Sequence, residues 1–262
     1  MLSENKFSSS QKTTFAILII LLVIRMIFYP LGLLIWHVTP AMLSPWFTTS
    51  YTCGAYTLIS ISIWLNKDNL QSLNIDKPFI MIFIFTGVLI ALYYSPTVFA
   101  IIIILITIRM IQELRDGQLN FGTVAPNYSR VIFLFGIGLF TLILLYVIRL
   151  FTKGVNGNGP GSLLLSMYNA SLPEVVVEEV IYRGMLWMFL RALNITDTRI
   201  LYIQTFLFWF SHLYYFSIPF TFWFWLPLSS LWFGILVWRS KSITTSTTAH
   251  YLYNLVAYIL QH

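Results

Sequence analysis

Three acidic residues lie close together in a chain that has only nine: Glu174, Glu178 and Glu179. They fall inside a long apolar run for which we predict a membrane-spanning helix at residues 163–193. Ionisable side chains at membrane depth are costly unless they are paired or hydrated, so they are candidates for function. A carboxylate in such a place can act as a general base toward a water molecule or a substrate.

The two adjacent glutamates point in different directions on a helix. Glu179 and Arg183 are four positions apart, so they share one face and are predicted to form an ion pair. Glu178 points about 100° away from that face, which leaves it as the predicted catalytic carboxylate. Glu174 is predicted to lie at the rim of the site. In a second interpretation the helix begins late, after Pro173, and its glutamates form a solvated first turn that complements the helix dipole.

Two later apolar runs each contain a histidine predicted to lie deep in the bundle. His212 lies four positions after Phe208, although a lone histidine in such a run is usually a buried structural residue. His250 and Asn254 are four positions apart, so they lie on one face of the last predicted helix. Ser211 directly precedes His212 and is expected to point to another face of its helix.

The predicted depths of these side chains are similar. From the assumed cytoplasmic ends of their helices, Glu178, His212 and Asn254 all lie at roughly 17–22 Å, given the helical rise per residue. We therefore expect them to converge near the middle of the membrane, with His250 nearer the cytoplasmic face.

The rest of the sequence is strongly apolar. It is 58% hydrophobic and 9% charged, with a mean hydropathy of +0.80, whereas a soluble domain is about a quarter charged. A bilayer crossing takes about 20 residues, so the chain is predicted to be an all-α, polytopic transmembrane helix bundle of eight or nine spans. The predicted helices cover residues 14–37, 43–65, 78–95, 97–112, 131–152, 163–193, 200–216, 218–238 and 243–260.

The basic residues indicate the orientation of the chain in a cell membrane. The net charge is +6, but Lys and Arg are scattered singly, so no nucleic-acid surface is predicted. With the N-terminus in the cytoplasm, eleven of the 15 fall on the cytoplasmic side, and only Arg149 and Lys153 fall outside. Arg25 and Arg183 lie within spans. This asymmetry favours nine crossings, with residues 78–112 crossing twice.

A Gly-rich segment divides the chain into two predicted parts. Residues 153–162 read KGVNGNGPGS, a composition typical of a flexible link. We expect accessory transmembrane helices at 1–152 and a catalytic helix bundle at 163–262, because the polar intramembrane residues concentrate in the second part.

The polar motifs of the second part occur together in one known family. Their order resembles the CAAX protease and bacteriocin-processing (CPBP, or Abi) family of intramembrane glutamic endopeptidases, which includes the Ras-converting CAAX proteases. The resemblance covers about residues 165–260. The matching motifs are Glu178-Glu179-x-x-x-Arg183, Phe208-x-x-x-His212 and His250-x-x-x-Asn254.

The resemblance implies a division of roles among these residues. Glu178, assisted by His212, would activate a water molecule for attack on a peptide carbonyl. His250 and Asn254 would stabilise the oxyanion by hydrogen bonds. Such donors stabilise developing negative charge most strongly where bulk water is excluded. Glu179, Arg183 and Phe208 would support the geometry of the site. No cofactor and no covalent nucleophile would be needed.

The resemblance also implies a membrane-associated peptide or protein as substrate. In bacterial members of the family this substrate would be a peptide pheromone or a bacteriocin, processed for maturation or immunity. Prenylated CAAX substrates belong to the eukaryotic branch, and no feature of this sequence points to recognition of a prenyl group.

Three other interpretations of the same residues stay open. Two histidines and a glutamate could bind a catalytic zinc ion, although the sequence has no His-Glu-x-x-His motif. A non-catalytic membrane scaffold or immunity protein would keep the helices without the chemistry. A proton-coupled transporter would use the glutamates and histidines as a proton relay, with no need for a donor pair at His250 and Asn254.

Overall fold

The computed structural model describes residues 7–28, 45–93, 97–122 and 171–259, together with positions 132, 135 and 136. Every secondary-structure element within these ranges is helical, which agrees with the all-α prediction. The N-terminal elements are α1 (Ser9–Val23), η1 (Ile24–Phe28), α3 (Pro45–Leu65), η2 (Lys67–Leu73), α4 (Lys77–Tyr93) and α5 (Thr97–Arg115). The C-terminal elements are α8 (Leu172–Glu179), η3 (Val180–Met185), α9 (Leu186–Ala192), α10 (Asp197–Phe210), η4 (Leu213–Tyr215), η5 (Thr221–Trp225), α11 (Leu226–Ser240) and α12 (Ile243–Ile259).

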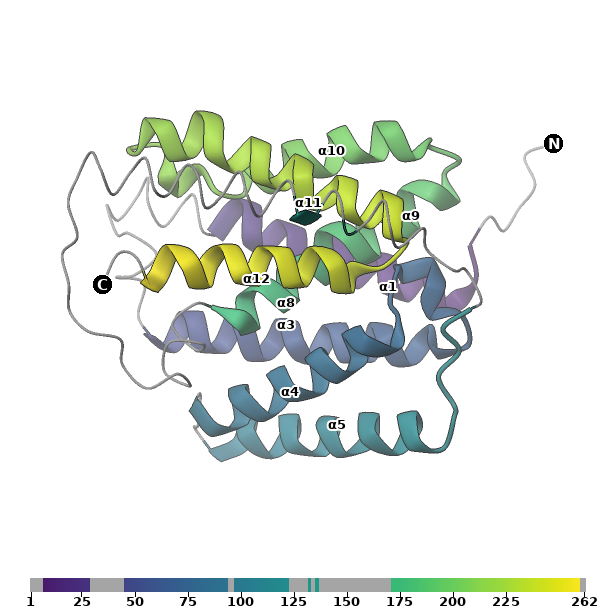
Figure 1. The fold of residues 1–262 in the computed structure, drawn as a ribbon. Helices are drawn as coiled ribbons and strands as arrows, with labels where there is room; N and C mark the ends of the chain where they lie inside the picture. The colour runs from purple at the N-terminus through teal and green to yellow at the C-terminus, as the bar shows by residue number, and fades with distance from the viewer. Residues whose placement is uncertain are drawn as a thin grey trace.

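The helices surround the continuous segment formed by α8, η3 and α9 (Figure 1). α12 and α3 pack against α8, and α1 packs against η3 and α9. α10 and α11 pair on one side of this centre, while α4 and α5 pair on the other. Residues from the first helix and from the last three helices therefore meet at one central segment.

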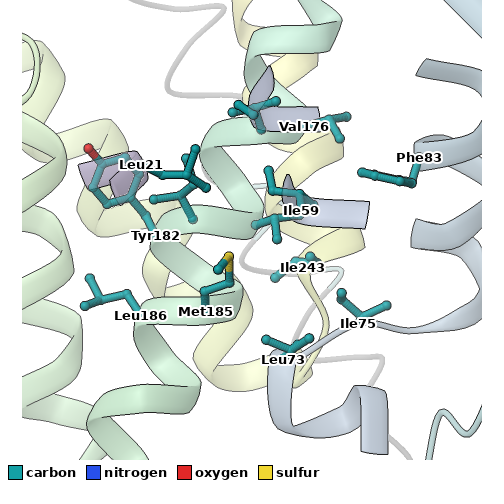
Figure 2. Close-up of a cluster of buried hydrophobic side chains, with 14 of the residues drawn as sticks. Leu21, Ile59, Leu73, Ile75, Phe83, Val176, Tyr182, Met185, Leu186 and Ile243 are labelled. Carbon is teal, nitrogen blue, oxygen red and sulfur yellow. The ribbon is translucent and has the colours of Figure 1, made fainter. Parts of the chain in front are cut away.

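The apolar core is built around the same central segment (Figure 2). Val176, Tyr182 and Met185 of this segment are fully buried. Leu21 reaches them from α1, and Ile59 reaches them from α3. Helices in a bilayer associate through close van der Waals packing, so these contacts hold α1 beside the segment that carries the glutamates.

A π-helical turn interrupts the central helix directly after Glu179. This turn, η3, contains Arg183 and Gly184, where a side chain would press against the backbone carbonyl of Leu73. Asn74, in the left-handed conformation that ends η2, donates through Nδ2 to the carbonyl oxygen of Arg183 at 2.7 Å. π-helical turns often occur at functional sites, and here the turn changes the register of the helix between the glutamates and α9.

Several predicted helix boundaries agree with the structure to within one turn, among them those of α3, α4, α5 and α12. The helix predicted at 163–193 is described only from Ser171 onward. Ser171 has a left-handed backbone (φ 60°), and α8 begins at the next residue, with Pro173 in its first turn. Glu178 and Glu179 are nevertheless buried, so the interpretation of the glutamates as a solvated first turn is wrong for these two residues.

The helix predicted at 200–216 is too long, because α10 ends at Phe210. The carbonyl oxygen of Phe208 lies 2.7 Å from both Ser211 Oγ and His212 Nδ1, so side chains bond to it in place of the next backbone N–H. Serine is one of the residues whose side chain competes with helical hydrogen bonds in this way. His212 therefore lies in a turn and not on a helix.

Two of the described helices are long and apolar enough to cross a membrane: Ser9–Ile27 and Thr221–Ser240. A third crossing results if Lys67–Leu73 and Lys77–Leu92, bent by 99°, form one broken span. α5 presents a surface suited to contact with lipid, because large apolar side chains such as Ile101, Ile104 and Leu105 are exposed on it. Eight or nine spans are not confirmed. The predicted span at 131–152, apart from positions 132, 135 and 136, and the link at 153–162 lie outside the described residues.

Candidate active site

Four ionisable side chains from four separate segments meet in the interior. Glu178 comes from α8, His212 from the turn after α10, His250 from α12 and Arg25 from η1. His212 Nε2 lies 3.7 Å from Glu178 Oε1, and His250 Nε2 lies 4.0 Å from Glu178 Oε2. All four are buried, with exposed fractions of 3–6%. The structure thus brings together three of the residues that the motifs predicted, and adds a fourth.

Glu179 faces a different set of partners from Glu178. Arg183 Nη1 lies 3.2 Å from Glu179 Oε1, which is the ion pair expected from the helical spacing. Ser246 donates to Glu179 Oε2 at 2.5 Å, and His250 Nδ1 lies 2.9 Å from Oε1. Because three donors hold both of its oxygens, Glu179 is suited to anchoring the site and poorly placed to accept a proton from water.

Phe208 lies at the centre of the polar cluster. Its ring lies under the guanidinium of Arg183, with Cζ 4.5 Å from the ring centroid. The rings of His212 and His250 lie at centroid distances of 4.4 and 5.9 Å from it. Arg183 also donates to Ser230 Oγ at 2.9 Å. Phe208 therefore packs against both histidines and against Arg183.

Hydrogen-bond partners assign the protons of the two histidines. His212 Nδ1 lies 2.7 Å from the Phe208 carbonyl oxygen, which can only accept, so Nδ1 carries the proton. The Nε2 atom of neutral His212 then presents a lone pair toward Glu178. His250 Nδ1 donates to the Glu179 carboxylate in the same way. His250 can therefore donate from Nε2 to an oxyanion only as an imidazolium.

Arg25 is the site residue that the sequence interpretation missed. Its Nη2 donates to Glu178 Oε1 and lies 3.4 Å from His212 Nε2. Glu178, which the helical spacing places away from Arg183, thus has a cationic partner of its own. The signal was present in the sequence, because an arginine inside a span needs an anionic partner at the same depth.

Ser211 contacts His212, against the expectation that it points to another face. Its Oγ lies 3.2 Å from His212 Nδ1 and donates to the carbonyl oxygen of Phe208. The reason is the early end of α10, which folds residues 211 and 212 back onto Phe208. Ser211 touches the ring nitrogen that faces away from Glu178, so its position does not suit a nucleophile.

Two predicted residues, Asn254 and Glu174, make no hydrogen bond to Glu178 within the described residues. Asn254 lies one turn beyond His250 on α12, is half-buried, and has no hydrogen bond to the site among the described residues. Of His250 and Asn254, it is His250 that lies close to Glu178. The depth estimate, which placed Asn254 level with Glu178, is therefore corrected. Glu174 is half-buried, one turn before Glu178, and within electrostatic range of Arg25.

The position of Arg25 bears on whether the site could hold a divalent cation. No group of three or more His, Cys, Asp or Glu side chains within the described residues is arranged to hold a metal ion. The guanidinium of Arg25 already occupies the space between Glu178 and His212. A cation placed there would meet a fixed positive charge.

One segment of the chain, which contains most of the site residues, matches a known protein family model. Residues 160–256 match the family model described as Type II CAAX prenyl endopeptidase Rce1-like. No curated protein and no solved structure matches the chain. The matched segment contains Glu178, His212, His250 and Asn254, whereas Arg25 lies outside it. Through residues 160–256 the chain is therefore similar to the Rce1-like type II CAAX prenyl endopeptidases.

Proposed function

We propose that this protein is an intramembrane endopeptidase in which Glu178 activates a water molecule for peptide-bond hydrolysis. One observation carries the proposal: a buried carboxylate meets His212 and His250, while the neighbouring Glu179 is neutralised separately by Arg183. Arg25 engages Glu178 Oε1, and within the described residues Oε2 has no hydrogen bond. Oε2 is therefore the oxygen that would accept a proton from water.

The proposed reaction needs no covalent intermediate with the enzyme. Glu178 takes a proton from water as the water oxygen bonds to the carbonyl carbon of the substrate, with the lone pair of His212 Nε2 as a second acceptor nearby. The carbonyl electron pair moves to oxygen, and His250, as an imidazolium, and Asn254 donate to that oxyanion. When the carbonyl re-forms, the carbon–nitrogen bond breaks and Glu178 returns the proton to the leaving amine.

The proposed substrate is a membrane-associated peptide or protein, and the bilayer is the proposed environment of a multi-pass chain with a cytoplasmic N-terminus. The family description names prenyl endopeptidases, so prenylated peptides form one substrate class. Unprenylated pheromone or bacteriocin precursors form the other, with a role in maturation or immunity. The same hydrolytic chemistry serves both classes.

The test uses the full chain, purified and reconstituted in liposomes with a panel of membrane-associated peptides. Matched farnesylated and unprenylated peptides separate the two substrate classes. Glu178→Ala is the inactive variant, and Asp116→Ala is the control because the Asp116 side chain is 50% exposed. We expect cleavage by the wild type and by the control, loss of cleavage in Glu178→Ala, and no effect of a metal chelator.

Three other results would contradict this proposal. Inhibition by the chelator, reversed by zinc, would favour a zinc mechanism. Proton-coupled flux without cleavage would favour a transporter. No cleavage and no flux, with a cellular phenotype still lost in Glu178→Ala, would favour a scaffold or immunity protein.

A further inference from the structure

Arg25 is a buried cation from a part of the chain that lies outside the matched segment. Its exposed fraction is 3%, and it lies in η1 at the end of the first helix. A buried charge is tolerated only when it is paired and hydrogen-bonded, and Arg25 donates to Glu178 Oε1. The first helix is thus connected to the proposed base by a direct contact.

Each of the two adjacent glutamates has its own arginine. Arg183 neutralises Glu179 from the same helix, and Arg25 neutralises Glu178 from another. Two neighbouring carboxylates in a medium of low dielectric repel each other, so loss of a cation that pairs with one of them favours its protonation. A protonated Glu178 could not accept a proton from water.

The position of the Arg25 guanidinium also determines which ring nitrogen of His212 can carry a proton. Arginine is permanently charged and has donors only, so any atom that approaches its N–H groups must be an acceptor. Arg25 Nη2 lies 3.4 Å from His212 Nε2 and also contacts Glu178. This arrangement agrees with the proton on His212 Nδ1 and leaves Nε2 unprotonated.

We propose that Arg25 is a positioning residue of the active site, which holds Glu178 as an oriented carboxylate and His212 Nε2 as a proton acceptor. This inference rests on the proposed function and extends it to the first helix. The segment 160–256 is then an incomplete site, because α1 and η1 supply the cation that keeps the base ionised. Arg25 acts through Glu178 and His212 and need not touch the substrate.

The test compares kcat, KM and thermal stability of the full-length wild type with those of Arg25→Met, Arg25→Lys and Arg25→Ala. Arg115→Met is the matched control, because the Arg115 side chain is 76% exposed. We expect Arg25→Met to lower kcat by about 10²-fold or more, the range for loss of one electrostatic partner, with a much smaller change in KM. Arg25→Lys keeps the charge and should retain at least about tenfold more activity than Arg25→Met. Added guanidinium should restore part of the kcat of Arg25→Ala.

Two results would overturn the role of Arg25. One is a kcat for Arg25→Met within about threefold of wild type, a change below 1 kcal/mol. The other is a loss of activity that only follows the folded fraction and is not rescued by lysine or guanidinium. If Arg25→Met does not fold, Arg25→Lys and the guanidinium rescue decide the question.

The same assay separates failure of this inference from failure of the proposed function. If Glu178→Ala abolishes cleavage but Arg25→Met does not, the proposed peptidase function stands and the positioning role of Arg25 is wrong. If no peptide is cleaved, a double-mutant cycle on thermal stability tests the pairing. Arg25→Met should then destabilise the wild type more than it destabilises Glu178→Gln, and equal effects would overturn the inference.

Discussion

Arg25 and Glu178 are 153 positions apart in the chain, yet they form a hydrogen-bonded ion pair in the interior. The neighbouring pair, Glu179 and Arg183, forms within one helical turn. The site therefore contains one ion pair set by helical spacing and one set by the packing of α1 against the central segment. The two ion pairs thus distinguish Glu179, which has a structural role, from Glu178, the proposed catalytic base.

Removal of Arg183 should destabilise the fold strongly. Arg183→Met leaves Glu179 as a buried charge without its cation, which costs about 3–5 kcal/mol. The double variant Glu179→Gln/Arg183→Met should recover part of that loss, because no isolated charge remains. Thermal unfolding in detergent measures both variants. Equal stability of the single and double variants would show that the pair is not energetically coupled.

His212 should carry its proton on Nδ1 at neutral pH. The Phe208 carbonyl accepts from Nδ1, which leaves Nε2 unprotonated beside Arg25. Nitrogen NMR of protein labelled at histidine distinguishes the two neutral tautomers, and His212→Asn identifies the signal. A protonated Nε2 in the neutral ring would contradict the assignment and would remove His212 as an acceptor for the proton of water.

Asn254 should affect catalysis much more than stability. If it donates to the oxyanion, Asn254→Ala should lower kcat by about 10²–10³-fold. Since Asn254 has no hydrogen bond to the site within the described residues and is half-buried, the melting temperature should change little. Steady-state kinetics on a cleaved peptide and a melting curve give the two values. A kcat near that of wild type would assign oxyanion stabilisation to His250 without Asn254.

Asp197 should contribute stability that depends on pH. Burial by itself would raise the pKa of Asp197, but hydrogen bonds from Arg191 and Lys241 outweigh it and hold this pKa below its usual range. The stabilisation is therefore present above the unfolded-state pKa of about 3.9 and is lost as pH falls through the lower folded-state value.

The variant Asp197→Asn checks this pH dependence. It should lower stability by about 1 kcal/mol at pH 7, and the difference from wild type should shrink below about pH 4. The exposed Asp116→Asn serves as the control in the same melting curves. A difference that stays constant between pH 7 and pH 3 would contradict the ion-pair origin.

Much of the site was predictable because it depends on spacing within single helices. The i and i+4 positions of Glu179 and Arg183 define a shared face in any helix, and the structure contains that pair. The apolar runs around the site also predicted the approximate limits of α3, α4, α5 and α12. The motifs themselves pointed to the family whose model matches residues 160–256.

Contacts between helices were decided only by the tertiary structure. The partner of Glu178 is Arg25, because packing places the end of the first helix beside α8 and η3. The fold also ends α10 before His212, because the side chains of Ser211 and His212 bond to the Phe208 carbonyl oxygen in place of a backbone N–H. Periodicity along a sequence reports which face of its own helix a residue occupies. It carries no information about which distant helix that face meets, since that depends on how whole helices pack.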